Sequence, residues 1–230
     1  RTIGHFQSIT HYLYFALMLH PCARTATRIA SMYPTTPEDA AISLLKDLIR
    51  NGCVNDLTPD SGHEERNADA LEEFFADTEG VRVQRFEPHP GRVSVAFTID
   101  GTDPDAEPLT LLGHTDVVPV DQEKWTRDPF GAEEADGRIY GRGACDMKSG
   151  LAVLLQTSVL LTEPRWDVTW VCYDLEEVEE SRNGLGRLAR NHPEWLVGDF
   201  AVLMEPSNAV VEGGCQGTLR IRVHARGVRA

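Results

Sequence analysis

Basic residues are in short supply in this 230-residue sequence, where 22 lysines and arginines stand against 36 acidic residues and the formal charge is −14. Proteins that bind nucleic acids usually need a basic face. Nucleic acid is therefore excluded as an expected partner. Disorder of the whole chain is excluded too, because 41% hydrophobic and 25% charged residues make an ordinary globular composition.

Paired cysteines are missing as well. The five cysteines are scattered along the chain, and none belongs to a C-x-x-C pair. Neither a disulfide framework nor a zinc-ribbon pattern is expected. A reducing, cytoplasmic environment fits this cysteine usage best.

Long apolar runs are also lacking. The longest, residues 12–19, is about half of the roughly 18 to 20 residues that a membrane span needs, so a soluble protein without a membrane partner is predicted. The same run could be the core of a secretory signal, but no convincing basic leader precedes it. We expect residues 1–33 to be an unassigned N-terminal extension that the fold does not use.

Helix and strand patterns begin at residue 34. Thr36 followed by Pro37 is typical of a helix start, and S-G-H-E at residues 61–64 matches a capping box. Alternation at period two predicts strands, and short apolar runs without alternation predict strands covered on both faces. The expected elements are helices at residues 36–52, 61–80, 151–161 and 185–191, strands at 81–83 and 93–99, and buried strands at 109–112, 168–173 and 200–204.

Helices that alternate with buried strands predict an α/β fold, with a mixed, largely parallel sheet flanked by helices. Residues 119–145 lack a sustained period and predict a long surface excursion with a short hairpin at Asp136-Gly137. Residues 219–225 alternate apolar residues with arginines and histidine, which predicts the first strand of a further unit.

Four groups of polar residues could carry chemistry. Three of them follow expected strands, which is the usual place for a site in an open α/β sheet. The exception lies in the glycine-rich stretch before the apolar helix. In chain order the groups are His114 with Asp116, Asp146, the pair Glu176 and Glu177, and Glu205.

Each group has an ordinary explanation when it is taken alone. His114 could be an isolated loop histidine, and Asp146 could cap the apolar helix that follows it. The Glu176-Glu177 pair could be a solvated start of a helix, and Glu205 could cap or lie at the surface. Together, however, one imidazole and several carboxylates form a donor set suited to Zn²⁺, Co²⁺ or Mn²⁺, beside which a further glutamate could act as a general base.

Several long motifs carry a resemblance to a known family. They are L-L-G-H-T-D-V-V-P, W-T-R-D-P-F-G, D-G-R-I-Y-G-R-G-A-C-D-M-K-S-G, the paired E-E and M-E-P-S. From about residue 37 to 230 the sequence resembles the co-catalytic metallo-aminoacylase and carboxypeptidase family, which includes desuccinylases, deacetylases and dipeptidases.

The resemblance implies a zinc exopeptidase-like catalytic domain over residues 34–213 that hydrolyses an amide bond with two Zn²⁺ ions. It also implies a non-proline cis peptide just after Asp146. The roles it implies are His114 and Glu205 on one metal, Glu177 on the second, Asp146 bridging both, Glu176 as the general base, and Asp116 orienting His114.

Two histidines of the family pattern would come from segments beyond this sequence. Residues 214–230 are expected to begin an α+β lid or dimerisation domain, through which a longer form would be a homodimer. After Asp146 the sequence holds only His192 and His224, and neither is expected to replace a ligand. The chain is therefore expected to be a truncated catalytic domain with little activity as it stands.

The expected substrate is a small N-acyl amino acid or dipeptide. From Trp166 onward the sequence looks most like desuccinylases of actinobacterial type, which implies N-succinyl-diaminopimelate and lysine biosynthesis. Residues 53–145 look more like carboxypeptidase-type members, so acetylornithine deacetylase or dipeptidase activity is the alternative. An inactive fragment or interaction domain built on the same fold is an alternative of another class.

Overall fold

A five-stranded mixed sheet forms the centre of the molecule in a computed structural model that describes residues 36–58, 60–76, 78–160, 163–177, 182–198, 200–207, 210–214, 224, 226 and 227. The extension expected at residues 1–33 lies outside the described residues. The strand expected at 219–225 also lies outside them, apart from His224.

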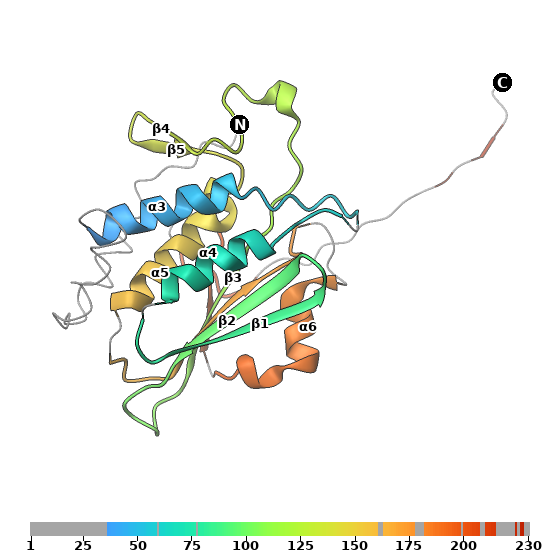
Figure 1. Ribbon diagram of the computed structural model, residues 1–230. Helices are drawn as coiled ribbons and strands as arrows, with labels where there is room; N and C mark the ends of the chain where they lie inside the picture. Colours follow the sequence, from blue (N-terminus) through green and yellow to red (C-terminus); the bar gives the residue numbers. More distant parts are fainter. Residues whose placement is uncertain are drawn as a thin grey trace.

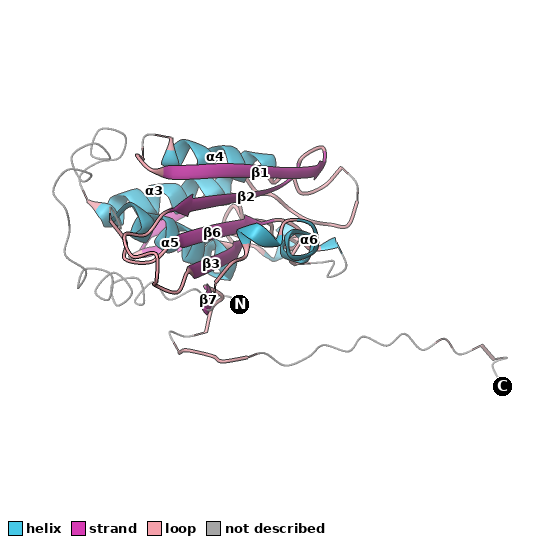
Figure 2. Ribbon diagram, turned by 90° about the horizontal axis from the view of Figure 1, so that it is seen from below, coloured by secondary structure: helices cyan, strands magenta, loops and turns pink. Residues whose placement is uncertain are grey.

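The strand order is β1-β2-β6-β3-β7, which Figure 2 shows from one edge to the other. β1 pairs antiparallel with β2 and β2 with β6, whereas β6, β3 and β7 run parallel. The predicted mixed sheet is therefore confirmed, and its three parallel strands end at one edge. The strand bounds are β1 Val81–His89, β2 Arg92–Ile99, β3 Leu109–His114, β6 Val168–Tyr173 and β7 Phe200–Leu203.

Helices cover both faces of this sheet. Figure 1 shows α3, α4 and α5 on one side and α6 on the other. No helix among the described residues has the length and hydrophobicity needed to cross a membrane. The helices are α3 Pro37–Arg50, α4 Glu65–Phe75, α5 Ser149–Leu160 and α6 Gly184–Asn191, with short turns η2 Gln122–Lys124, η3 Ala144–Lys148 and η5 Pro193–Trp195.

The main hydrophobic core lies between α3, α4, α5 and the sheet. Phe75 of α4 is at its centre, with its ring centroid 4.5 Å from that of Phe97 and 6.0 Å from that of Trp170. Residues 151–156 of α5 are all buried, which explains why the sequence of this helix is almost wholly apolar. A smaller cluster on the other face packs Leu188 of α6 against the sheet.

The first two helices test the cap predictions. The Thr36 hydroxyl accepts a hydrogen bond from the Asp39 N–H at 3.2 Å, so the predicted start of α3 is confirmed. The predicted capping box of α4 is wrong: the helix begins at Glu65, with no side-chain cap, and it ends at Phe75 rather than near Gly80.

The reason is a distant competitor for the capping-box side chains. The Ser61 hydroxyl accepts a hydrogen bond from the Arg92 guanidinium at 2.9 Å, and the Glu64 carboxylate accepts another at 2.9 Å. Both partners of the Glu64–Arg92 pair are buried. A charge-assisted bond to a buried guanidinium is stronger than a bond to a helix N–H.

The prediction that residues 200–204 form a strand buried on both faces is also wrong in part. β7 forms as expected, but among the described residues it is the edge of the sheet and pairs only with β3. Phe200 is 65% exposed and Leu203 is 47% exposed. An apolar run predicts a strand, but it does not distinguish an interior strand from an edge strand.

The hairpin predicted at Asp136-Gly137 is confirmed. β4 (Glu133–Ala135) pairs antiparallel with β5 (Arg138–Tyr140). Asp136 and Gly137 have φ values of 54° and 69°, and this left-handed pair is the conformation that a two-residue hairpin turn requires.

Candidate metal site

The candidate site lies at the edge where the three parallel strands end. His114 is the last residue of β3, Glu177 follows the end of β6, and Glu205 follows the end of β7. Gly113 makes room beside His114, because a Cβ at this position would lie 2.6 Å from Leu151 Cδ2. The strand can therefore pack closely against α5 at the point where it delivers the imidazole.

Four of the predicted site residues come together here. Ligand atoms of His114, Asp146 and Glu177 all lie within 4.8 Å of one another, and they are the group among the described residues that could hold a metal ion. The Nε2 atom of His114 is 3.3 Å from Asp146 Oδ1 and 3.5 Å from Glu205 Oε1. Two carboxylates from separate segments therefore lie next to this ring nitrogen.

Asp146 is placed by a kink rather than by a helix start. Its φ and ψ are −118° and 101°, and α5 begins three residues later at Ser149, so Asp146 does not occupy the N-cap position of α5. The Asp146–Met147 peptide is cis, as the family resemblance implies. Two residues later, the buried Lys148 ammonium donates to the Leu48 and Gly52 carbonyls at the end of α3.

The imidazole of His114 is held on its other side by Asp116. His114 Nδ1 is 3.0 Å from the Asp116 backbone oxygen and 3.5 Å from the carboxylate oxygen Oδ1. Burial by itself lowers the pKa of His114, but contacts with Asp116 and Asp146 outweigh it and raise that pKa to about 11. The ring therefore has a strong electrostatic attraction to the anionic cluster.

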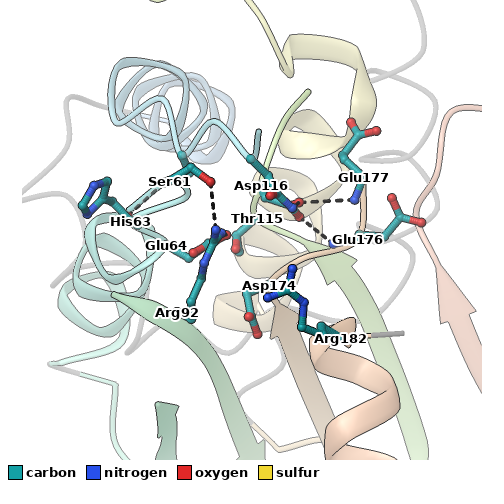
Figure 3. Close-up of polar contacts among 12 residues, drawn as sticks. Ser61, His63, Glu64, Arg92, Thr115, Asp116, Asp174, Glu176, Glu177 and Arg182 are labelled. Carbon is teal, nitrogen blue, oxygen red and sulfur yellow. Dashed lines mark hydrogen bonds and ion pairs between the residues drawn. The ribbon is translucent and has the colours of Figure 1, made fainter. Parts of the chain in front are cut away.

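The Asp116 carboxylate has a second set of contacts, which Figure 3 shows. It accepts hydrogen bonds from the backbone N–H groups of Glu176 at 3.0 Å and Glu177 at 3.2 Å. The Asn55 side-chain amide donates to it as well, at 3.1 Å. Sequence reasoning missed Asn55, because an asparagine in a loop 61 residues away carries no local signal of this contact.

The Glu176-Glu177 pair lies in a loop that bends at Glu177. Leu175 has a left-handed φ of 57°, and helix α6 begins at Gly184 with Asn183 as its N-cap. Residues 178–181 lie outside the described residues, so the alternative of an acidic helix start stays a prediction. The bend presents both N–H groups to Asp116, and the two glutamate side chains leave it in different directions in Figure 3.

The carboxylates are crowded enough to hold protons. Burial, followed by the charge of Asp146, raises the pKa of Glu177 to about 7. Burial also raises the pKa of Glu205 to about 8, although the neighbouring His114 opposes this shift. The half-buried acids outnumber the single imidazole among them, and a divalent cation would offset the crowded negative charge.

The remaining histidines of the second half lie elsewhere. The His192 ring packs on Phe86 with centroids 4.9 Å apart, and its Nδ1 is 3.3 Å from Glu194 Oε1. His224 is exposed. Neither belongs to the described group of possible metal ligands.

Comparisons with known proteins show the family to which the chain belongs. Residues 110–224 match Peptidase family M20/M25/M40. The succinyl-diaminopimelate desuccinylase of Corynebacterium glutamicum is 42% identical over 180 residues, which are 76% of this chain and 45% of that protein. A putative succinyl-diaminopimelate desuccinylase of Mycobacterium tuberculosis is 45% identical over 122 residues, covering 53% of this chain and 33% of that protein.

A solved structure of the same family has a similar fold. The M20 family metallo-carboxypeptidase Sso-CP2 from Sulfolobus solfataricus matches with a TM-score of 0.59 and 26% identity, covering 72% of this chain and 37% of that one. The chain therefore belongs to the M20 peptidase family. It spans less than half of the length of these two curated relatives.

Proposed function

We propose that this chain is the catalytic part of a metal-dependent hydrolase that cleaves the amide bond of N-succinyl-diaminopimelate. The observation that carries the proposal is the meeting of His114 with Asp146, Glu177 and Glu205 at the ends of three parallel strands and the kink before α5. The 42% identity to a named desuccinylase supports the substrate.

The donor set fits zinc, because an imidazole nitrogen and carboxylate oxygens are ordinary zinc ligands. His114, Asp146 and Glu205 would hold one ion, and Glu177 with Asp146 would hold the second. Zinc bound in this way supplies Lewis-acid polarisation of a carbonyl and increases the acidity of a water molecule. Co²⁺ and Mn²⁺ suit the same donors.

The chain's own residues have distinct tasks in this proposal. The Glu176 carboxylate acts as a general base that takes a proton from the attacking water and passes it to the leaving amine nitrogen. Asp116 fixes the His114 ring from behind and holds the Glu176 and Glu177 backbone by their N–H groups. One residue, through its backbone oxygen and its carboxylate, therefore aligns both the ligand and the base.

The domain boundaries remain part of the proposal. Residues 34–213 would be the catalytic domain and residues 214–230 the start of a lid through which a longer form dimerises. The greater length of the relatives supports this division. A carboxypeptidase or dipeptidase activity is the second candidate, since Sso-CP2 is a metallo-carboxypeptidase.

Zinc titration of this chain tests the metal site. We expect one tightly bound ion and a second that binds much more weakly, because the second would have only Glu177 and the shared Asp146 from the described site. His114→Ala should abolish the tight site, whereas the exposed His192→Ala should not. Tight binding that survives His114→Ala would sink the assignment.

The substrate is tested in the longest reading frame that contains this sequence. Turnover of N-succinyl-diaminopimelate should exceed that of acetylornithine and of simple dipeptides, with the Corynebacterium glutamicum relative as the positive control. A preference for dipeptides would favour the second candidate. The 230-residue chain alone is expected to hydrolyse all three substrates near background.

A further inference from the structure

An ion pair between the buried Asp174 and the half-buried Arg187 lies at the start of the Glu176-Glu177 bend. Asp174 is the first residue after β6 and is 0% exposed. Its carboxylate accepts hydrogen bonds from Arg187 Nη2 at 2.7 and 2.9 Å and from the Ser94 hydroxyl at 2.5 Å. The Ser94 hydroxyl in turn accepts from the Asp174 backbone N–H at 3.2 Å.

This pair also fixes the beginning of α6. The Gly184 N–H donates to the Asp174 carbonyl at 2.8 Å. A Cβ on Gly184 would lie 2.3 Å from Asp174 Oδ1 and 2.5 Å from Ser94 Oγ, so only glycine fits at this contact. Arg187 is one helical turn further along α6. The helix is therefore docked on the end of β6 by both backbone and side-chain contacts.

The bend that carries the two glutamates is consequently held at two points. Asp116 holds the N–H groups of Glu176 and Glu177 from the β3 side. Asp174, two residues before Glu176, holds the start of the bend through Arg187 and Ser94. Figure 3 shows Asp116 joined by dashed lines to Glu176 and Glu177, and Asp174 apart from it.

We propose that Arg187 is a positioning residue that sets the Glu176-Glu177 bend through its ion pair with Asp174. A buried carboxylate whose cation is removed is forced toward protonation or toward water. Either change releases the start of the bend, and Glu177 then leaves its place beside His114 and Asp146. That Glu177 matters for hydrolysis rests on the proposed function. That Arg187 sets the position of the bend does not depend on it.

The test compares Arg187→Met with two variants of α6. Arg187→Lys keeps the charge but loses the planar fork, and Arg190→Met removes an exposed arginine from the same helix. Hydrogen exchange of the segment 174–177 is measured in the metal-free chain, and zinc affinity is measured by titration. Both readouts use the chain as it exists.

In Arg187→Met we expect faster exchange in segment 174–177, while strands β2 and β3 keep their protection. The weaker zinc site, which needs Glu177, should lose about 10-fold to 100-fold in affinity, as is usual when a residue behind a ligand is removed. The tight site should change much less. Arg187→Lys should recover part of both effects, and Arg190→Met should match the parent chain.

Unchanged exchange in a folded Arg187→Met variant would overturn the proposal, and so would an equal increase over the whole chain, which indicates only a stability role. If Arg187→Met does not fold, Ser94→Ala is measured instead, because it weakens the same network without unpairing a charge. A parent chain that binds no zinc, but whose bend still depends on Arg187, would refute the proposed function and leave the positioning role standing.

Discussion

Along one edge of the sheet, the antiparallel half holds a buried acid beside a buried base, whereas the parallel half gathers acids around one imidazole. In the first half, Glu64 meets Arg92 with an N–O distance of 2.9 Å. In the second, His114 faces Asp146 and Glu205, with Glu177 close by. Figure 3 shows the Glu64–Arg92 pair and the Glu176-Glu177 bend in one view.

The difference lies in where the positive charge comes from. The Glu64–Arg92 pair contains its own cation, so it needs no ligand and serves to join the loop before α4 to the start of β2. The acids of the parallel half outnumber the cationic groups among them, because Asp146, Glu177 and Glu205 surround the single His114 imidazole. The first arrangement is structural, and the second is suited to an external cation.

The largest expected effect is on the rate of hydrolysis, and it comes from a substitution that removes no metal ligand. In a longer form that is active, Glu176→Gln should lower kcat by about 10²-fold to 10⁴-fold, because a general base is removed and no ligand is lost. Zinc affinity should stay close to that of the parent protein. Asp146→Ala should lose zinc as well as activity, and kinetic assays paired with titrations measure both.

Equal loss of zinc in Glu176→Gln and in Glu177→Gln would show that the roles of the two glutamates are not separate. Loss confined to Glu176→Gln would mean that the roles are reversed. The structure favours the stated order, because it is Glu177 that joins the group of possible ligands.

The next largest effect comes from breaking the buried Glu64–Arg92 pair. Arg92→Met leaves Glu64 buried without the guanidinium that donates to it, so the free energy of unfolding should fall by about 3 to 5 kcal/mol in urea titrations. Zinc binding should persist wherever the chain remains folded. The control is Arg82→Met, which removes an arginine that is 64% exposed and should cost less than about 1 kcal/mol.

A cost for Arg92→Met that is no larger than that of Arg82→Met would contradict the comparison. The double variant Glu64→Gln with Arg92→Met tests whether the cost comes from the charge that is left unpaired. Because this variant removes both charges, it should be less destabilised than Arg92→Met alone.

The sequence predicts much of the fold and the site where the signal is local. His114, Glu177 and Glu205 each follow an apolar strand, and strands that run parallel must end at one edge. Asp146 was placed by the family motif, since its kinked backbone has no simple local pattern. The pattern also predicted β7, although not its exposure.

What the sequence does not predict depends on contacts between distant residues. Asn55 reaches Asp116 across 61 residues, and Ser94 reaches Asp174 across 80. Ser61 matches a capping box, yet its hydroxyl bonds Arg92, 31 residues further on. Local patterns cannot show which of two possible hydrogen-bond partners is closer in the folded chain.

The smallest expected effect is a change of stability with pH, which tests the Glu64–Arg92 pair through the ionisation of Glu64. Burial raises the pKa of Glu64 to about 8, even though Arg92 lowers it, and Glu64 Oε2 is buried without a hydrogen-bond partner. The native chain therefore holds this proton more tightly than the unfolded chain does. The stability contributed by the protonated form is present below the ordinary pKa near 4.5 and is lost as pH rises toward 8. Urea titrations from pH 5 to pH 8 should show this decline, and Glu64→Gln, which cannot ionise, should lack that part of it. A decline of the same size in both proteins would mean that Glu64 stays ionised throughout and that the pair behaves as a fully charged ion pair.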